Sequence, residues 1–172
     1  TIKGIENILK TVCQLIEGGK IVAIKGVGGF HLACDATNES VVAELRRRKN
    51  REGKPFAVMF GSLEKVREYA DVNNKEEELL LSEKRPIVLL KKKLSNPISE
   101  DVSPRNKYFG AMLPYTPLHY LLLKHGFTAL VMTSGNLSEE PIAIDNQDAF
   151  LRLGKIADYF LIHNREIYLR SD

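Results

Sequence analysis

Short apolar segments alternate with longer segments of helical periodicity along this chain of 172 residues, and this alternation constrains the fold more than any other feature. Each apolar segment is four or five residues long, which is the length of a short buried strand. These segments are IVAIK, FAVMF, IVLL, TALVM and DYFLI, at residues 21–25, 56–60, 87–90, 128–132 and 158–162. Strands that alternate with helices predict an α/β architecture, in which helices cover one twisted sheet.

The segments between these strands carry the signals of helix ends. Residues 5–19 place a stripe of apolar side chains on one helical face and end at two glycines. Asn38 or Ser40 can cap a second helix, which ends near Gly53 and Pro55. Further helices are expected at residues 62–70, 74–84, 117–126 and 145–155. Loops are expected at residues 25–35, about 94–117 and 131–142, and a solvated lysine run at residues 91–93.

Composition limits the class of protein. With 44% hydrophobic and 27% charged residues, the chain reads as one soluble globular domain over residues 1–172. The apolar runs fall far short of the roughly 20 residues of a membrane span, and no leader opens the chain, so we expect no membrane association and a cytoplasmic location. Cys13 and Cys34 lack metal-ligand spacing, which predicts two core cysteines and no zinc. A net charge of only +3 argues against a nucleic-acid partner.

The first candidate loop is KGVGGFHLACD, residues 25–35. Gly26, Gly28 and Gly29 would let the backbone approach a ligand closely. The sixth position of a dinucleotide-binding fingerprint is His31 here, and no Walker A sequence follows. The spacing alone therefore favours a tight turn, and His31 alone is more typical of a structural histidine.

The second candidate loop is RRRKNREGKPF, residues 46–56. Helical spacing spreads the first three arginines around a helix, and Arg46 and Arg47 are expected to be solvated. Lys49, Arg51 and Lys54 lie at or beyond the fraying end of the helix, where they can converge. Arginine forks and a lysine ammonium suit phosphate oxygens. The alternative is a solvated helix end, which is what most charge runs are.

The third candidate loop is VMTSGNLSEEPI, residues 131–142. Thr133, Ser134, Asn136 and Ser138 supply hydroxyls and an amide that can bind a phosphate or a sugar without ionisation. The same composition is also that of an ordinary turn. The residues leave both interpretations open.

Taken together, these motifs resemble a known family. Lys49-Asn50-Arg51 with Lys54-Pro55, and Ser134-Gly135-Asn136, are similar to the KxR and SxN motifs of YrdC-like domains. More narrowly, KGVGGFHLACDA, LRRRKNREGKPFAVM, MLPYTPLHYLL, TSGNLSEEPI and IHNREIYLRSD resemble the YrdC-like domain of HypF carbamoyltransferases over nearly the whole chain. The resemblance implies a twisted mixed sheet with a concave basic face. It also implies that residues 1–172 are one module of a longer protein with acylphosphatase, zinc-finger and second nucleotide-binding domains.

The resemblance implies a reaction as well. Carbamate, released from carbamoyl phosphate elsewhere in the full protein, would attack ATP to give carbamoyl-adenylate and pyrophosphate, and the carbamoyl group would pass to a cysteine of the partner HypE in hydrogenase maturation. Mg²⁺ would be held largely through the triphosphate, with no metal ligand from the protein. Lys49, Arg51 and Lys54 would hold the triphosphate and offset its charge, while Ser134 and Asn136 would fix a phosphate or the carbamoyl group.

The remaining candidates follow by position in the resembling motifs. His31 joins Lys49 and Arg51 as a catalytic candidate and would line the floor near the carbamoyl end with Gly28 and Gly29. Rim candidates are Tyr115, Arg165 and Arg170.

Two other functions remain open at this point. A threonylcarbamoyl-adenylate synthase for tRNA modification shares KxR and SxN, although those enzymes usually carry a Thr-Val-Tyr type segment where this chain has Phe30-His31. A non-catalytic RNA-binding module could use the basic cluster, but the weak net charge and the lack of paired surface aromatics argue against it.

Overall fold

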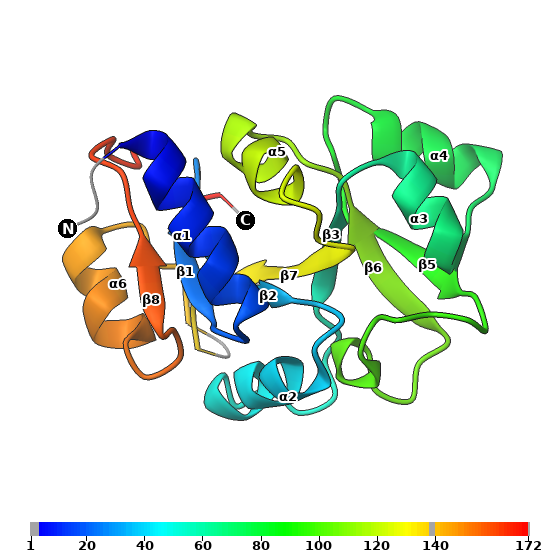
Figure 1. Ribbon diagram of the computed structural model, residues 1–172, viewed down its shortest axis with the longest axis horizontal. Helices are drawn as coiled ribbons and strands as arrows, with labels where there is room; N and C mark the ends of the chain where they lie inside the picture. Colours follow the sequence, from blue (N-terminus) through cyan, green and yellow to red (C-terminus); the bar gives the residue numbers. More distant parts are fainter. Residues whose placement is uncertain (1–3, 138–139, 172) are drawn as a thin grey trace.

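The computed structural model describes residues 4–137 and 140–171, and in them one eight-stranded mixed sheet carries helices on both faces (Figure 1). The strands are β1 (Val22–Lys25), β2 (Phe30–Asp35), β3 (Ala57–Phe60), β4 (Ala70–Asp71), β5 (Val88–Lys92), β6 (Tyr108–Met112), β7 (Ala129–Ser134) and β8 (Tyr159–Leu161). The helices are α1 (Ile5–Glu17), α2 (Glu39–Arg48), α3 (Leu63–Tyr69), α4 (Asn74–Leu81), the 3₁₀ helix η1 (Glu100–Val102), α5 (Pro117–Leu123) and α6 (Asn146–Leu153). The predicted α/β architecture is confirmed.

The strand order is β4-β5-β6-β3-β7-β2-β1-β8. The pairs β1–β8 and β3–β6 are parallel, and the other pairs are antiparallel. Strands that are neighbours in the centre of the sheet therefore come from distant parts of the chain.

Each face of the sheet supports its own core, because side chains alternate between the faces along each strand. On one face, Phe30 and Leu32 of β2 pack with side chains of α2, α3, α4 and α6. On the other face, Ile24 of β1 and Met132 of β7 pack with α1 and α5. Figure 1 shows α1 lying across β1 and β2, with α5 beside it. Cys13 and Cys34 are buried, one in each core, as predicted.

The predicted helix starts are confirmed by their caps. The side chain of Asn38, rather than that of Ser40, accepts from the backbone N–H of the third residue of α2. Ser62 caps α3 in the same way, and Thr116 caps α5 just before Pro117. These caps satisfy N–H groups that no helical carbonyl can reach.

Two strands lie where loops were predicted, so those predictions were wrong. Residues 30–35 form β2, which is covered on both faces and therefore lacks the alternation of polar and apolar residues that marks a half-buried strand. Tyr108–Met112 form β6 in the middle of the sheet. A Cβ at Gly110 would lie 2.7 Å from Ile87 Cγ2, so β6 needs a glycine that itself argues against a strand in the sequence.

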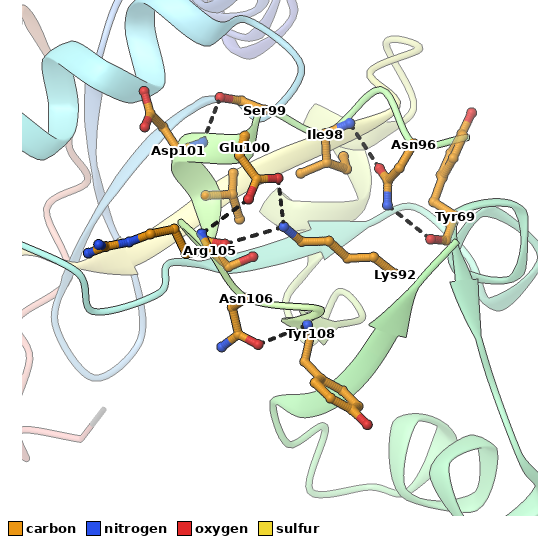
Figure 2. Close-up of polar contacts among 12 residues, drawn as sticks. Tyr69, Lys92, Asn96, Ile98, Ser99, Glu100, Asp101, Arg105, Asn106 and Tyr108 are labelled. Atoms are coloured by element: carbon orange, nitrogen blue, oxygen red, sulfur yellow. Dashed lines mark hydrogen bonds and ion pairs between the residues drawn. The ribbon is translucent and has the colours of Figure 1, made fainter. Parts of the chain in front are cut away.

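The loop between β5 and β6 is organised by polar contacts (Figure 2). Lys92, predicted to be solvated, belongs to β5 instead, and its ammonium lies 3.1 Å from a Glu100 carboxylate oxygen and 3.3 Å from the Ser103 carbonyl. Asn96 donates to the Tyr69 carbonyl and accepts from Ile98 N–H. These contacts tie the loop to β5 and to the end of α3, and η1 within it also packs against α2, where the second candidate loop begins.

Across residues 4–137 and 140–171, no helix has both the length and the apolar character needed to cross a membrane.

Candidate functional site

Lys49 joins the second and third candidate loops. It lies at the C-terminal cap of α2, is fully buried, and extends to the end of β7. Its Nζ atom donates to the Ser134 carbonyl at 2.6 Å, to the Asn136 carbonyl at 2.5 Å and to Asn136 Oδ1 at 2.8 Å. These contacts direct the Lys49 ammonium at the backbone and the amide of the third loop.

The side chains of the third loop are held in one arrangement. Ser134 Oγ donates to Asn136 Oδ1 at 2.8 Å, and Asn136 Nδ2 donates to the Glu140 carbonyl at 2.6 Å. Because Lys49 and Ser134 both donate to Oδ1, the orientation of the Asn136 amide is determined by its partners. Ser138, also predicted here, lies outside the described residues.

Gly135 locks this loop onto β2. Its N–H donates to the Phe30 carbonyl at 2.6 Å, and a Cβ at Gly135 would lie 2.6 Å from the same oxygen. Only a glycine allows the two backbones to approach this closely. The Ala143 N–H in turn donates to the Gly135 carbonyl, so the loop is tied at both ends.

The arginines at the end of α2 have different roles, and the prediction that Arg46 is solvated was wrong. Arg46 Nη1 donates to the carbonyls of Arg51 and Lys54, at 2.6 and 3.1 Å, and its other nitrogens donate to Asp101 in η1. Its guanidinium also lies 4.6 Å from the centre of the Phe56 ring. Arg47, with a 71% exposed side chain paired to Glu44, is the solvated residue that was expected.

Arg51 and Lys54 occupy the loop that Arg46 shapes. Arg51 Nε and Nη2 donate to the carbonyls of Lys54 and Pro55, at 3.3 and 3.0 Å. Among the described residues, Arg51 Nη1 and the exposed Lys54 ammonium make no hydrogen bond to protein. These two cations therefore retain donors for an anion, whereas the donors of Lys49 are directed at the third loop.

His31 lies beside the third loop on the sheet. In the β2–β7 register it stands opposite Ser134, so both side chains project from the same face. His31 Nε2 lies 3.2 Å from the Tyr115 hydroxyl. The structure therefore brings together two predicted candidates, His31 and Tyr115, on the face that also carries Ser134.

A third ring, that of His119, completes this group. It meets the Tyr115 ring edge-on at 4.5 Å between centroids and the His31 ring at 6.3 Å. Burial, and secondarily the charge of His31, lowers the pKa of His119 to about 4. His119 is therefore neutral at neutral pH.

The predicted glycines of the first loop are covered by the chain itself. A Cβ at Gly28 would lie 2.5 Å from the Ser171 carbonyl oxygen, and the Ser171 N–H donates to the Gly28 carbonyl. A Cβ at Gly29 would lie 2.6 Å from Ile142 Cδ1. The hydrogen bond between Ser171 and Gly28 places the neighbouring Arg170 next to the first loop. Arg165 is exposed and makes no hydrogen bond or ion pair with another described residue.

Three residues that were not predicted as site residues belong to this region. His119 and Arg46 are buried or partly buried on inward helix faces, and Lys25 is only 5% exposed, with Nζ 3.4 Å from the His163 carbonyl. Helical spacing was a usable signal for the first two, since Arg46 follows Val42 by four residues and His119 precedes Leu122 by three. Lys25 shares the side of β1 that carries Ala23.

Within the described parts of the chain, no group of three or more His, Cys, Asp or Glu residues gathers where it could hold a metal ion. Two shallow hollows, of about 470 and 590 Å³, lie along α4 and beside β4 and β5. Neither is lined by a residue of the cluster around Lys49 and His31. The candidate site therefore rests on the polar cluster rather than on a deep cavity.

Comparison with known proteins gives consistent matches. A family model labelled Sua5_yciO_yrdC and described as "Telomere recombination" matches residues 14–172. Carbamoyltransferase HypF of Synechocystis sp. is 54% identical over 157 residues, which cover 91% of this chain and 20% of that protein. The chain therefore spans about a fifth of this relative.

Two solved structures agree with this result. Full-length HypF in a phosphate- and nucleotide-bound form superposes with a TM-score of 0.92 at 52% identity, over 95% of this chain and 26% of the other. HypF of T. kodakarensis superposes with a TM-score of 0.94 at 48% identity, over 100% of this chain and 22% of the other. The predicted resemblance in sequence and fold is confirmed.

Proposed function

Since the chain belongs to the Sua5/YciO/YrdC family, we propose that it is the domain of a HypF-type carbamoyltransferase that binds ATP and forms carbamoyl-adenylate. Identity of about half to HypF proteins, one of them solved with phosphate and nucleotide, supports this proposal. The alternative functions, which the experiment below distinguishes from this one, are threonylcarbamoyl-adenylate synthesis and RNA binding.

The observation that carries the proposal is the contact between Lys49 and the loop of Ser134 and Asn136. It joins the KxR and SxN motifs, which are 85 residues apart at this contact, into one hydrogen-bonded unit. A hydroxyl and an amide fixed at a strand end can bind a small polar group in one orientation. Arg51 and Lys54 add two cations with donors still available.

In the proposed reaction, a carbamate oxygen attacks the α-phosphorus of ATP and forms a new P–O bond. The bond from that phosphorus to the bridging oxygen of the β-phosphate breaks, and pyrophosphate leaves with the electron pair. Arg51 and Lys54 would hold the triphosphate and stabilise the charge that develops on the departing group. Mg²⁺ enters as part of the substrate MgATP, bound largely by phosphate oxygens.

Of the other candidates, Lys49 would hold the loop in place, and the rest would lie against the substrate. Lys49 would act through the loop, because its ammonium is directed at loop oxygens, and Ser134 and Asn136 would bind the α-phosphate or the carbamoyl group. His31 and Tyr115 would lie beside that group on the same sheet face. The covered turn at Gly28 and Gly29 and the rim arginines Arg165 and Arg170 remain candidates by their place in the motifs.

In the whole protein, other HypF domains would release carbamate from carbamoyl phosphate, and a second site would pass the carbamoyl group to a cysteine of HypE. Both steps lie outside the role proposed for residues 1–172.

The test is pyrophosphate release by the chain supplied with MgATP and ammonium carbamate. We expect carbamate-dependent release and a rise of about tenfold or more in the ATP dissociation constant for Arg51→Ala, because Arg51 lies in the loop beside Lys54 and keeps Nη1 available for a phosphate oxygen. Arg47→Ala should leave this constant unchanged, because Arg47 is solvated and paired with Glu44. Release that requires bicarbonate and threonine would instead assign threonylcarbamoyl-adenylate synthesis. Salt-sensitive RNA affinity without release would assign a binding module.

A further inference from the structure

The group of three rings at the start of α5 supports an inference beyond the proposed reaction. We propose that His119 is a positioning residue, whose ring holds Tyr115 and His31 as a hydrogen-bonded pair on the sheet face that carries Ser134. Its effect on turnover rests on the proposed function, whereas its effect on the geometry of the pair does not.

The fold fixes His119 independently of any ligand. Thr116 Oγ1 accepts from the His119 N–H at 3.3 Å and caps α5, which sets the rotation of the first helical turn. His119 is 1% exposed and lies on the inward face of α5 with Leu122 and Leu123. Its ring is therefore a rigid part of the core against which other rings can be placed.

The two rings that His119 contacts are less constrained by their own positions. Tyr115 precedes α5 and is 44% exposed, and His31 is only partly buried on β2. The edge-on contact of 4.5 Å, with an interplanar angle of 80°, limits the rotation of Tyr115. The Tyr115 hydroxyl then lies 3.2 Å from His31 Nε2.

Protonation fits this arrangement. Because burial keeps His119 uncharged at neutral pH, it places no positive charge beside His31. A neutral His31 that carries its proton on Nδ1 can accept the Tyr115 O–H at Nε2. The direction of the Tyr115–His31 hydrogen bond depends on the tautomer of His31, so the ¹⁵N signals of that ring report on the pair.

The buried nitrogen of His119 makes phenylalanine an informative replacement. His119 Nδ1 is buried and has no hydrogen-bond partner among the described residues. A phenylalanine would fill a similar space without burying an unpaired nitrogen, and so would be more stable. His119→Phe therefore separates the contact made by the ring from the cost of burying its nitrogen.

The experiment compares His119→Ala, His119→Phe and Tyr115→Phe, with Tyr120→Phe as a matched control. Tyr120 is on the same helix, is 50% exposed and makes no side-chain hydrogen bond with another described residue. Imidazole ¹⁵N NMR reports the tautomer of His31 in the full chain. Pyrophosphate release gives kcat and the KM for ATP, and thermal unfolding gives stability.

We expect His119→Ala and Tyr115→Phe to shift the His31 ¹⁵N signals and to lower kcat about tenfold or more, with the KM for ATP changed less than twofold. His119→Phe keeps the edge-on contact, so it recovers most of the loss and raises the melting temperature. Tyr120→Phe changes none of these values.

A His119→Ala variant that melts earlier but keeps the wild-type His31 signals and kcat would overturn the proposal, since His119 would then be core only. If His119→Ala does not fold, unchanged His31 signals in Tyr115→Phe overturn it equally. Absence of pyrophosphate release in the wild type would remove the proposed function, while the NMR comparison would still decide whether His119 orders the pair.

Discussion

Replacing Lys49 with methionine tests whether this buried cation holds the loop of Ser134 and Asn136 in place or binds phosphate directly. Methionine keeps most of the side-chain length and removes the charge and all three donors. Asn136 Oδ1 still accepts from Ser134 Oγ, and the Ser134 carbonyl still accepts from Asn136 N–H. The Asn136 carbonyl loses its hydrogen bond from the Lys49 ammonium.

The magnitude follows from opposing contributions. Three charge-assisted hydrogen bonds would contribute roughly 5–9 kcal/mol if they were additive, but the methionine avoids the cost of several kcal/mol of burying an ammonium. Since two of the three acceptors keep another donor, we expect a net loss of about 3 kcal/mol in the free energy of unfolding. For a chain of this size that corresponds to a fall of roughly 6–12 °C in melting temperature.

Urea unfolding followed by circular dichroism measures the loss, and isothermal titration measures ATP binding. Arg47→Met is the matched control, because it removes a cation of the same helix that is exposed and paired only with Glu44. Arg51→Ala should show the opposite pattern, with weak ATP binding and stability within about 1 kcal/mol of wild type. A Lys49→Met protein with unchanged stability and lost ATP affinity would refute our reasoning, because it would place Lys49 on the phosphate itself.

Three further predictions follow from the same contacts. Asn136→Asp should fold, because Lys49 and Ser134 still donate to one carboxylate oxygen. It should nearly abolish pyrophosphate release, because the other carboxylate oxygen faces the Glu140 carbonyl and adds negative charge beside phosphate. Normal release from a folded Asn136→Asp variant would contradict this prediction. Arg46→Ala should cost about 2–3 kcal/mol in the free energy of unfolding by urea, whereas Arg47→Ala should cause no measurable loss; equal small losses would indicate that Arg46 is solvated after all. Burial lowers the pKa of His119 to about 4, so between that pH and about 6.5 the unfolded chain binds a proton that the folded chain does not. The free energy of unfolding should be highest above about pH 6.5 and fall by up to about 3 kcal/mol as the pH is lowered to about 4. His119→Phe should lose this pH dependence.

The elements that were predicted from sequence are those with a strong local signal. The five apolar segments and the capped helices are encoded within ten to fifteen residues each, and both the strands and the caps lie where they were expected. The strands β2 and β6 were missed because burial on both faces and a required glycine remove the local alternation.

For the candidate site, the residue types alone left an anion site open beside a tight turn, a solvated helix end and an ordinary loop. Helical spacing could have separated Arg46 from Arg47. The contact of Lys49 with Asn136 could not be derived from local patterns, because it depends on β7 lying next to β3 and β2 in the sheet. Resemblance to a family supplied the connection that spacing alone did not.

The strand order has a consequence for how the chain folds. The central strand β3 has β6 on one side and β7 on the other, and β7 pairs with β2 nearly a hundred residues earlier in the chain. Contacts of such long sequence separation are slow to form, because the entropy of closing a large loop is lost before the pairing is gained. During synthesis from the N-terminus, α2 and β3 would emerge well before β7. The Lys49 ammonium would therefore stay hydrated until its acceptors on Ser134 and Asn136 are synthesised. We therefore expect the candidate site around Lys49 to be among the last parts of the domain to gain protection from amide hydrogen exchange during refolding.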